Sequence, residues 1–173
     1  MDARLHHVQG KTERVKPPDL LALLLDLYRD KLALRLRHES AARGIKDYDF
    51  NNTYQYIIAR EDTHLSWLRS AVAGLGGSVA DVPVPSTETP RGDEAEILAK
   101  DAAEAQAFVD RWRDRIETVT NARHRTMLRL VLGETLEHKR FFDQAGAGRT
   151  DLLGRRADGA GTGGGVMPTR WVE

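Results

Sequence analysis

The sequence contains no cysteine, which excludes disulfides, thiolate zinc sites, iron–sulfur clusters and cysteine nucleophiles. It also has no excess of either charge, since 26 Lys and Arg residues balance 26 Asp and Glu residues, so we expect no nucleic-acid partner. No apolar run approaches a membrane span, because the leucine-rich run Leu20–Leu27 is short and contains Asp26. The polar segment 1–18 lacks the apolar centre of a signal peptide. These absences predict a soluble, cytoplasmic protein without a membrane partner.

What the sequence does contain is a helical period of apolar residues in four segments of a 173-residue chain, a length that suits one domain. Asp19 is predicted to cap the first helix, and Asn51 or Asn52 the second. Residues 1–18 are interpreted as an N-terminal arm, 19–146 as the helical domain and 147–173 as a Gly-rich tail. The helices are predicted at 20–43, from the Asn pair to Gly74, at 93–118 and at 122–145.

The connections between these helices are short, long and short. The long one, residues 78–92, contains three prolines and no helical pattern. A helix of about 23 residues is about 34 Å long, and an extended Pro-rich segment of about 15 residues can run back along it. We therefore expect the third helix to begin at the same end as the second and to lie parallel to it. This pattern predicts an all-α, up-down four-helix bundle with a long crossover between helices two and three.

The segment Tyr54–Leu68 of the second helix forms a mostly apolar stripe that also contains Glu61 and His64. These two residues are spaced i, i+3, so they share one face of the helix and are predicted to point into the core. A buried carboxylate needs a partner, because an isolated charge in an apolar interior is costly. Glu61 and His64 are therefore the first candidate metal ligands.

The chain from about 19 to 146 resembles the ferritin-like superfamily, and most closely its rubrerythrin and bacterioferritin branches. The resemblance depends on Glu61-x-x-His64, on a helix that ends in LGG before a crossover, and on His138 within LGETLEHKRFF. It implies iron or manganese at a carboxylate–histidine site, iron handling or redox chemistry of oxygen or peroxide, and pairing of two chains along helix faces. In that family each of helices one and three supplies a Glu, and each of helices two and four a Glu-x-x-His.

Carried over to this chain, the family pattern is matched on the second helix by Glu61 and His64 and on the fourth by His138. Thr135 stands where the fourth helix would carry its Glu, and Glu134 is one residue away. The other carboxylate candidate is Glu104, beside Ala105 on the third helix, while the position on the first helix falls on Tyr28.

Three arrangements remain open from the sequence. Glu104 and Glu134 could complete a di-metal site, or Glu61, His64 and His138 could hold a single ion. The same core residues could instead form a metal-free hydrogen-bond network. In the metal-free case we expect a non-catalytic bundle that acts as an assembly or interaction module.

Two further features are interpreted outside the core. Four basic residues of the first helix are predicted to form a solvated face. His38-Glu39, near the end of that helix, is predicted to cap it or to be solvated, with a position facing the core as the alternative. A Gly-rich tether precedes the terminal VMPTRWVE, which is predicted to dock on a partner protein or a neighbouring subunit. The basic residues are Arg29, Lys31, Arg35 and Arg37, and the docking residues are Val166, Met167, Pro168, Trp171 and Val172.

Overall fold

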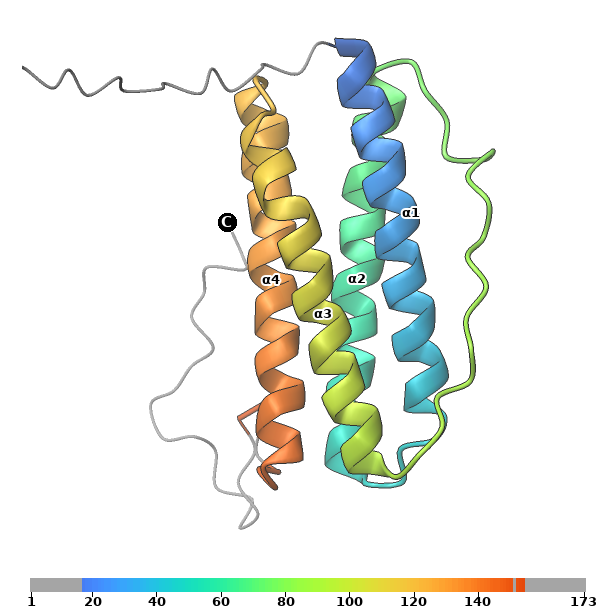
Figure 1. Cartoon of the computed structure of the whole chain (residues 1–173), viewed down its shortest axis with the longest axis vertical. Coiled ribbons are helices and arrows are strands. Elements are labelled where there is room, and N and C mark those ends of the chain that lie inside the picture. The colour runs from blue at the N-terminus through green and yellow to red at the C-terminus, as the bar shows by residue number, and fades with distance from the viewer. Residues whose placement is uncertain (1–16, 151, 155–173) are drawn as a thin grey trace, which may run out of the picture.

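The computed structural model describes residues 17–150 and 152–154, and within them the chain forms four helices and no strand. α1 and α4 lie at opposite corners of the bundle, and each packs against both α2 and α3 (Figure 1). This arrangement confirms the all-α four-helix bundle predicted from the sequence. The helices are α1 (Pro17–Ala42), α2 (Tyr48–Gly74), α3 (Glu94–Glu117) and α4 (Ala122–Gly146).

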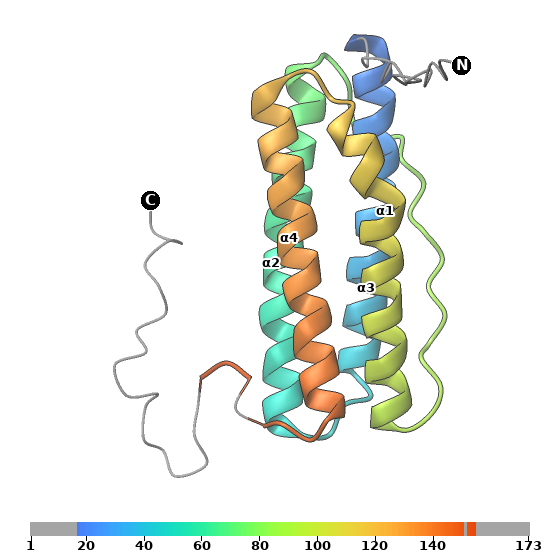
Figure 2. The same cartoon turned by 60° about the vertical axis from the view of Figure 1, so that its left-hand side comes forward.

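The crossover between α2 and α3 runs the full length of the bundle along the outside of α1 (Figures 1 and 2). It returns the chain to the end at which α2 begins, so α2 and α3 are parallel to each other and antiparallel to α1 and α4. The predicted direction of the third helix is therefore confirmed. The same path places the crossover residues Ser86, Thr87 and Glu88 beside α1 and α3.

The starts of the helices follow from local side-chain chemistry, and two of them differ from the prediction. α1 begins at Pro17 rather than after Asp19, because proline is well tolerated in a first helical turn. α2 is capped by Asp47, not by the Asn pair, and the Asp47 side chain accepts a hydrogen bond from the amide of Phe50. α3 begins at a capping box in which the Asp93 side chain and Glu96 satisfy each other's backbone amides.

The core consists of two apolar clusters with a polar layer between them. The first cluster surrounds Trp112 and Leu68, and the second surrounds Tyr54 and Phe142. Along α2 and α4 the residues between these clusters are buried but polar, as are several residues that face them from α1 and α3. This layer contains Lys31, His38, Glu61, His64, Asp101, Glu134, Thr135 and His138.

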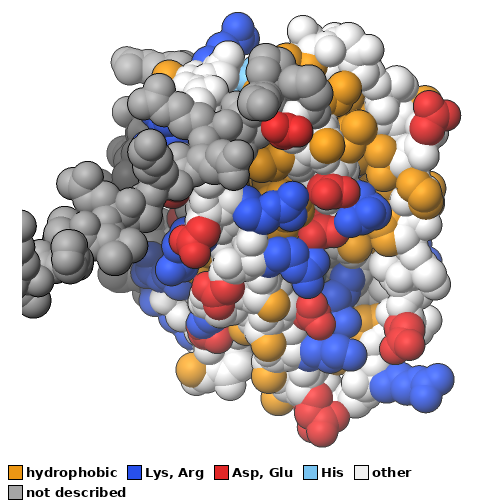
Figure 3. All heavy atoms as spheres, turned by 45° about the horizontal axis from the view of Figure 1, so that its top comes forward, with side chains coloured by type: hydrophobic (Ala, Val, Ile, Leu, Met, Phe, Trp, Pro, Cys, Tyr) orange, Lys and Arg blue, Asp and Glu red, His pale blue; other side chains and the backbone are white. Residues whose placement is uncertain are grey.

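On the outside of the bundle, ion pairs join α1 to α3, including Arg111 to Asp30 at 2.8 Å and Arg115 to Asp26 at 3.7 Å. Figure 3 shows charged side chains of both signs mixed over the face in view. No helix in the described part of the chain is long and apolar enough to cross a membrane.

The predicted N-terminal arm falls almost entirely outside the described residues, and the docking peptide 166–173 does so completely. The peptide's partner therefore remains a prediction, as does the pairing of two chains.

Candidate functional site

Glu61 lies at the centre of the polar layer, and its side chain is completely enclosed. It is held there by the inward face of α2, where Ile58 and Leu65 are also buried. Its Oε1 accepts a hydrogen bond from Nζ of Lys31 at 2.9 Å, and its Oε2 lies 2.9 Å from Nδ1 of His38. Since a carboxylate only accepts hydrogen bonds, Nδ1 of His38 carries the proton between them. Both oxygens of Glu61 are thus bound by side chains of α1.

Lys31 is the cation of this layer, and its side chain has no exposed surface. Besides Glu61, its Nζ donates to Oγ1 of Thr135 on α4 at 3.1 Å. The Thr135 hydroxyl in turn donates to the carbonyl of Val131, so it is free to accept from Lys31. The ammonium also lies over the ring of Phe108, 5.2 Å from the ring centroid. Lys31 therefore contacts side chains of all three other helices.

Glu134 is the second buried carboxylate, and it joins α4 to α2. Its Oε2 accepts from Nε2 of His64 at 2.7 Å. The Arg60 guanidinium binds both of its oxygens, at 2.7 to 3.0 Å. Such a bidentate contact is the strong form of the Arg–carboxylate pair. Glu134 therefore reaches into the core, although it lies one residue from the position that the family pattern gives.

Three imidazole nitrogens in the layer are buried and have no hydrogen-bond partner within the described part of the chain: Nε2 of His38, Nδ1 of His64 and Nδ1 of His138. His138 stacks on His64 with ring centroids 6.1 Å apart. Its Nδ1 is 3.9 Å from Oε1 of Glu61, which is too long for a hydrogen bond.

A third buried carboxylate, Asp101 of α3, lies toward the second apolar cluster. Its Oδ2 accepts from the hydroxyl of Tyr54 at 2.5 Å, and its Oδ1 accepts from Nε of Arg37 at 2.6 Å. Burial and the adjacent Asp101 carboxylate raise the pKa of Tyr54 far above its usual value, so the phenol keeps its proton and donates.

Each buried carboxylate of the layer is therefore paired with a lysine or arginine side chain. The three pairs are Glu61 with Lys31, Glu134 with Arg60 and Asp101 with Arg37. Such pairing allows charged groups to be enclosed at all, because an unpaired ion in this interior would be strongly destabilising.

The pKa values of the acids and of the histidines are both lowered, those of the acids by their partners and those of the histidines by burial. Burial acts to raise the pKa of Glu61, but His38 and Lys31 lower it well below its usual value. For Glu134, His64 and Arg60 similarly overcome burial and lower the pKa. The pKa of His138 falls well below 6.5, mainly because of burial and then because Lys31 is near. Burial also lowers the pKa of His64, against the opposing effect of Glu134.

These shifts predict that the protein loses stability in two stages as the pH falls. Below about 6.5 the unfolded chain protonates His64 and His138 while the folded protein resists, and below about 4.5 the same holds for Glu61 and Glu134. In each case the unfolded state binds more protons, so the free energy of unfolding decreases. Urea unfolding between about pH 8 and pH 4 measures this decrease. His138→Gln should remove part of the first stage, and a free energy that stays constant from pH 7 to pH 5 would contradict the assignment.

The structure brings together four of the five predicted ligands and separates the fifth. Glu61, His64, Glu134 and His138 all lie in the polar layer. Glu104 does not, because this part of α3 turns it outward, where it is exposed and lines a surface cleft. The expectation that Glu104 supplies a core carboxylate is therefore wrong.

Two residues of α1 that were assigned to the solvent are instead buried, because the inward face of α1 differs from the predicted one. Lys31 was predicted to lie on a basic, solvated face, and His38 to cap or be solvated, yet neither side chain is exposed. Arg37, from the same predicted face, is mostly enclosed through its contact with Asp101. Tyr28 packs in the first apolar cluster rather than in the polar layer.

This donor set does not fit a metal centre of the type that the resemblance implies. A di-metal site needs about four carboxylates to neutralise its cations, whereas Glu61 and Glu134 are already neutralised by Lys31 and Arg60. The Lys31 ammonium also touches Glu61 at the point where helices α1, α2 and α4 converge. Within the described residues, no three His, Asp or Glu side chains are arranged to hold a metal ion.

Comparison of the chain with models of known protein families finds no match, and comparison with curated proteins finds none either.

Proposed function

We propose that this protein is a ferritin-like bundle in which a lysine has replaced the metal centre, and that it acts as a binding module rather than as a metal-dependent oxidoreductase. The topology supports the first part, since α2 and α3 are joined by the long crossover typical of ferritin-like folds. The placement of Glu61 and His64 on α2, and of Thr135 and His138 on α4, supports it further. Both pairs are spaced i, i+3 and both face inward.

The contact between Lys31 and Glu61 carries the proposal. At 2.9 Å, with both side chains completely buried, the ammonium supplies the positive charge that a metal would otherwise provide to this carboxylate. Adding a divalent cation beside Lys31 would place like charges together in a medium that screens them poorly. The polar layer therefore stabilises the bundle internally, and the carboxylates of Glu61 and Glu134 are not free to bind a metal.

Elemental analysis of the purified full-length chain tests the proposal. We expect sub-stoichiometric iron, manganese and zinc, both as purified and after incubation with each metal followed by desalting. The competing function is a metal site in which Lys31 withdraws and Glu61, Glu134, His64 and His138 bind iron or manganese. About one or two equivalents of metal per chain, lost in Glu61→Ala, would establish that function and overturn ours.

The Glu61→Ala variant requires a check on folding, because it leaves Lys31 buried without its partner. Helical content measured by circular dichroism provides this check. Glu104→Ala is the matched control, since Glu104 is exposed and its loss should change neither the metal content nor the helical content.

A further inference from the structure

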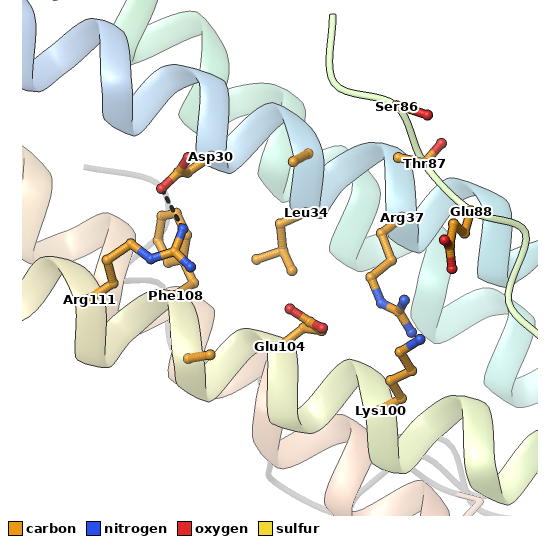
Figure 4. A pocket seen from close by; sticks show the side chains of 12 residues that line it. Asp30, Leu34, Arg37, Ser86, Thr87, Glu88, Lys100, Glu104, Phe108 and Arg111 are labelled. Atoms are coloured by element: carbon orange, nitrogen blue, oxygen red, sulfur yellow. Dashed lines mark hydrogen bonds and ion pairs between the residues drawn. The ribbon is translucent and has the colours of Figure 1, made fainter.

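A cleft of about 320 Å³ lies between α1 and α3, beside the crossover (Figure 4). Because the two helices are antiparallel, Arg37 of α1 faces Lys100 of α3 at one end, and Asp30 faces Arg111 at the other. Asp30 and Arg111 bind each other at 2.8 Å. The two ends therefore differ, since one is a closed ion pair and the other presents two cations, with the Glu88 carboxylate of the crossover beside them.

At the cationic end, Arg37 has a buried nitrogen without an acceptor. Its Nε is held by Asp101, but its Nη2 is buried and has no hydrogen-bond partner among the described residues. Leaving such a donor unsatisfied is costly, and an anion in the cleft would satisfy it once the guanidinium turns Nη2 toward the cleft. Lys100 is exposed, lines the same end and has no ion-pair partner in the described part of the chain. Arg37 and Lys100 together can receive a carboxylate.

The middle of the cleft combines apolar surface with the carboxylate of Glu104, the cleft's second acidic group besides Glu88. Leu34 and Phe108 line it from α1 and α3. Glu104 lies one helical turn from Lys100, and its carboxylate points into the same space (Figure 4). Within the described residues Glu104 has no ion-pair partner. A Lys that precedes a Glu by four residues is also the weaker order for a helical ion pair, so Lys100 competes only weakly for Glu104.

We propose that this cleft binds a small apolar amino acid. The ligand's carboxylate would lie between Nη2 of Arg37 and the Lys100 ammonium, and its ammonium group would bind Glu104. Its side chain would cover Leu34 and Phe108. A molecule with both charges fits better than a simple anion, because the cleft presents Glu104 close to its cations. The cleft is separate from the buried Glu61–Lys31 pair, so this inference does not depend on whether that layer binds metal.

Isothermal titration of the full-length protein with L-leucine tests the proposal, together with two analogues that each lack one charge. These are 4-methylpentanoate, which lacks the ammonium group, and 3-methylbutylamine, which lacks the carboxylate. We expect saturable binding of L-leucine, and affinity lower by about tenfold or more for each analogue, because each loses a charge-assisted hydrogen bond. Equal affinity for 4-methylpentanoate, or displacement of L-leucine by inorganic phosphate, would overturn the proposal in favour of a simple anion site.

Two exposed positions provide variants that should fold normally. Lys100→Met should weaken L-leucine binding by about tenfold, and Glu104→Gln should weaken L-leucine binding while leaving that of 4-methylpentanoate unchanged. Lys46→Met, an exposed lysine outside the cleft, is the matched control and should bind as the unmodified protein does. Absence of saturable binding, or unchanged affinity in Lys100→Met, would overturn the proposal.

Discussion

Replacing Lys31 by methionine is expected to lower the free energy of unfolding by about 3–5 kcal/mol, the usual effect of removing one partner of a buried ion pair. Methionine has a length and shape similar to those of lysine, so the packing against Phe108 changes little. The loss comes instead from the Glu61 carboxylate, which stays enclosed with His38 as its remaining close partner. Urea unfolding followed by circular dichroism measures the change.

The double variant Lys31→Met/Glu61→Gln separates the lost pairing from any lost packing. Glutamine is neutral and keeps an oxygen to accept from His38, so no charge is left buried without a partner. We expect the double variant to be more stable than Lys31→Met alone. Comparison with both single variants, Lys31→Met and Glu61→Gln, should give a large favourable coupling between the two positions. Lys46→Met is the control, and its stability should match that of the unmodified protein because Lys46 is exposed. A loss in the double variant equal to the sum of the losses in Lys31→Met and Glu61→Gln would show that Glu61 and Lys31 do not interact.

Most of the fold could be predicted from the sequence because it depends on coarse features. The inward face of α2 was identified correctly, since Ile57, Leu65 and Leu68 leave little freedom in the phase of the stripe. The direction of α3 followed from the length of the crossover alone. These features tolerate errors of a residue or two at helix ends, such as the predicted cap that lies at Asp47 instead of the Asn pair.

The polar layer was harder to predict because α1 is leucine-rich on several faces. The apolar residues that the sequence suggests for the inward face of this helix are Leu21, Leu24, Leu25, Tyr28, Leu32 and Leu36. Of these, Leu24 and Tyr28 are buried in the structure, whereas the other four are half-buried. The stripe that faces the core has alternating spacings of three and four residues, and it contains a lysine and a histidine. A search of the sequence for apolar residues at a helical period therefore misses this stripe, because two of its positions are occupied by polar residues. Its members are Leu20, Leu24, Leu27, Lys31, Leu34, His38 and Ala41.

The inward position of Glu134, one residue from the family pattern, was also hard to predict. Glu134 and Thr135 are both buried although they are adjacent, because Thr135 points toward Lys31 while Glu134 is drawn to His64 and Arg60. Spacing along one helix does not reveal partners that other helices supply. The Arg60–Glu134 contact joins residues 74 positions apart.

The variant Lys31→Glu/Thr135→Glu is expected to acquire metal binding, which by our proposal the unmodified protein lacks. Lys31 touches both Glu61 and Thr135, so side chains at these three positions converge in the structure. The two substitutions would place three carboxylates there and complete an inward Glu-x-x-His on α4 with His138, beside the one that α2 already carries. Manganese and cobalt suit such oxygen and imidazole ligands.

The expected result is about one or two equivalents of manganese or cobalt per chain by elemental analysis, with a higher unfolding temperature in the presence of metal. Without metal the variant should be less stable than the unmodified protein, since three acidic groups would share one enclosed space. Lys46→Glu/Thr63→Glu makes the same charge change at sites outside the core and should bind no metal. A folded core variant that binds no metal would show that positions 31, 61 and 135 do not converge. Binding by the core variant alone would show that this helical bundle still has metal-site geometry, and that the charge of Lys31 is what excludes the ion.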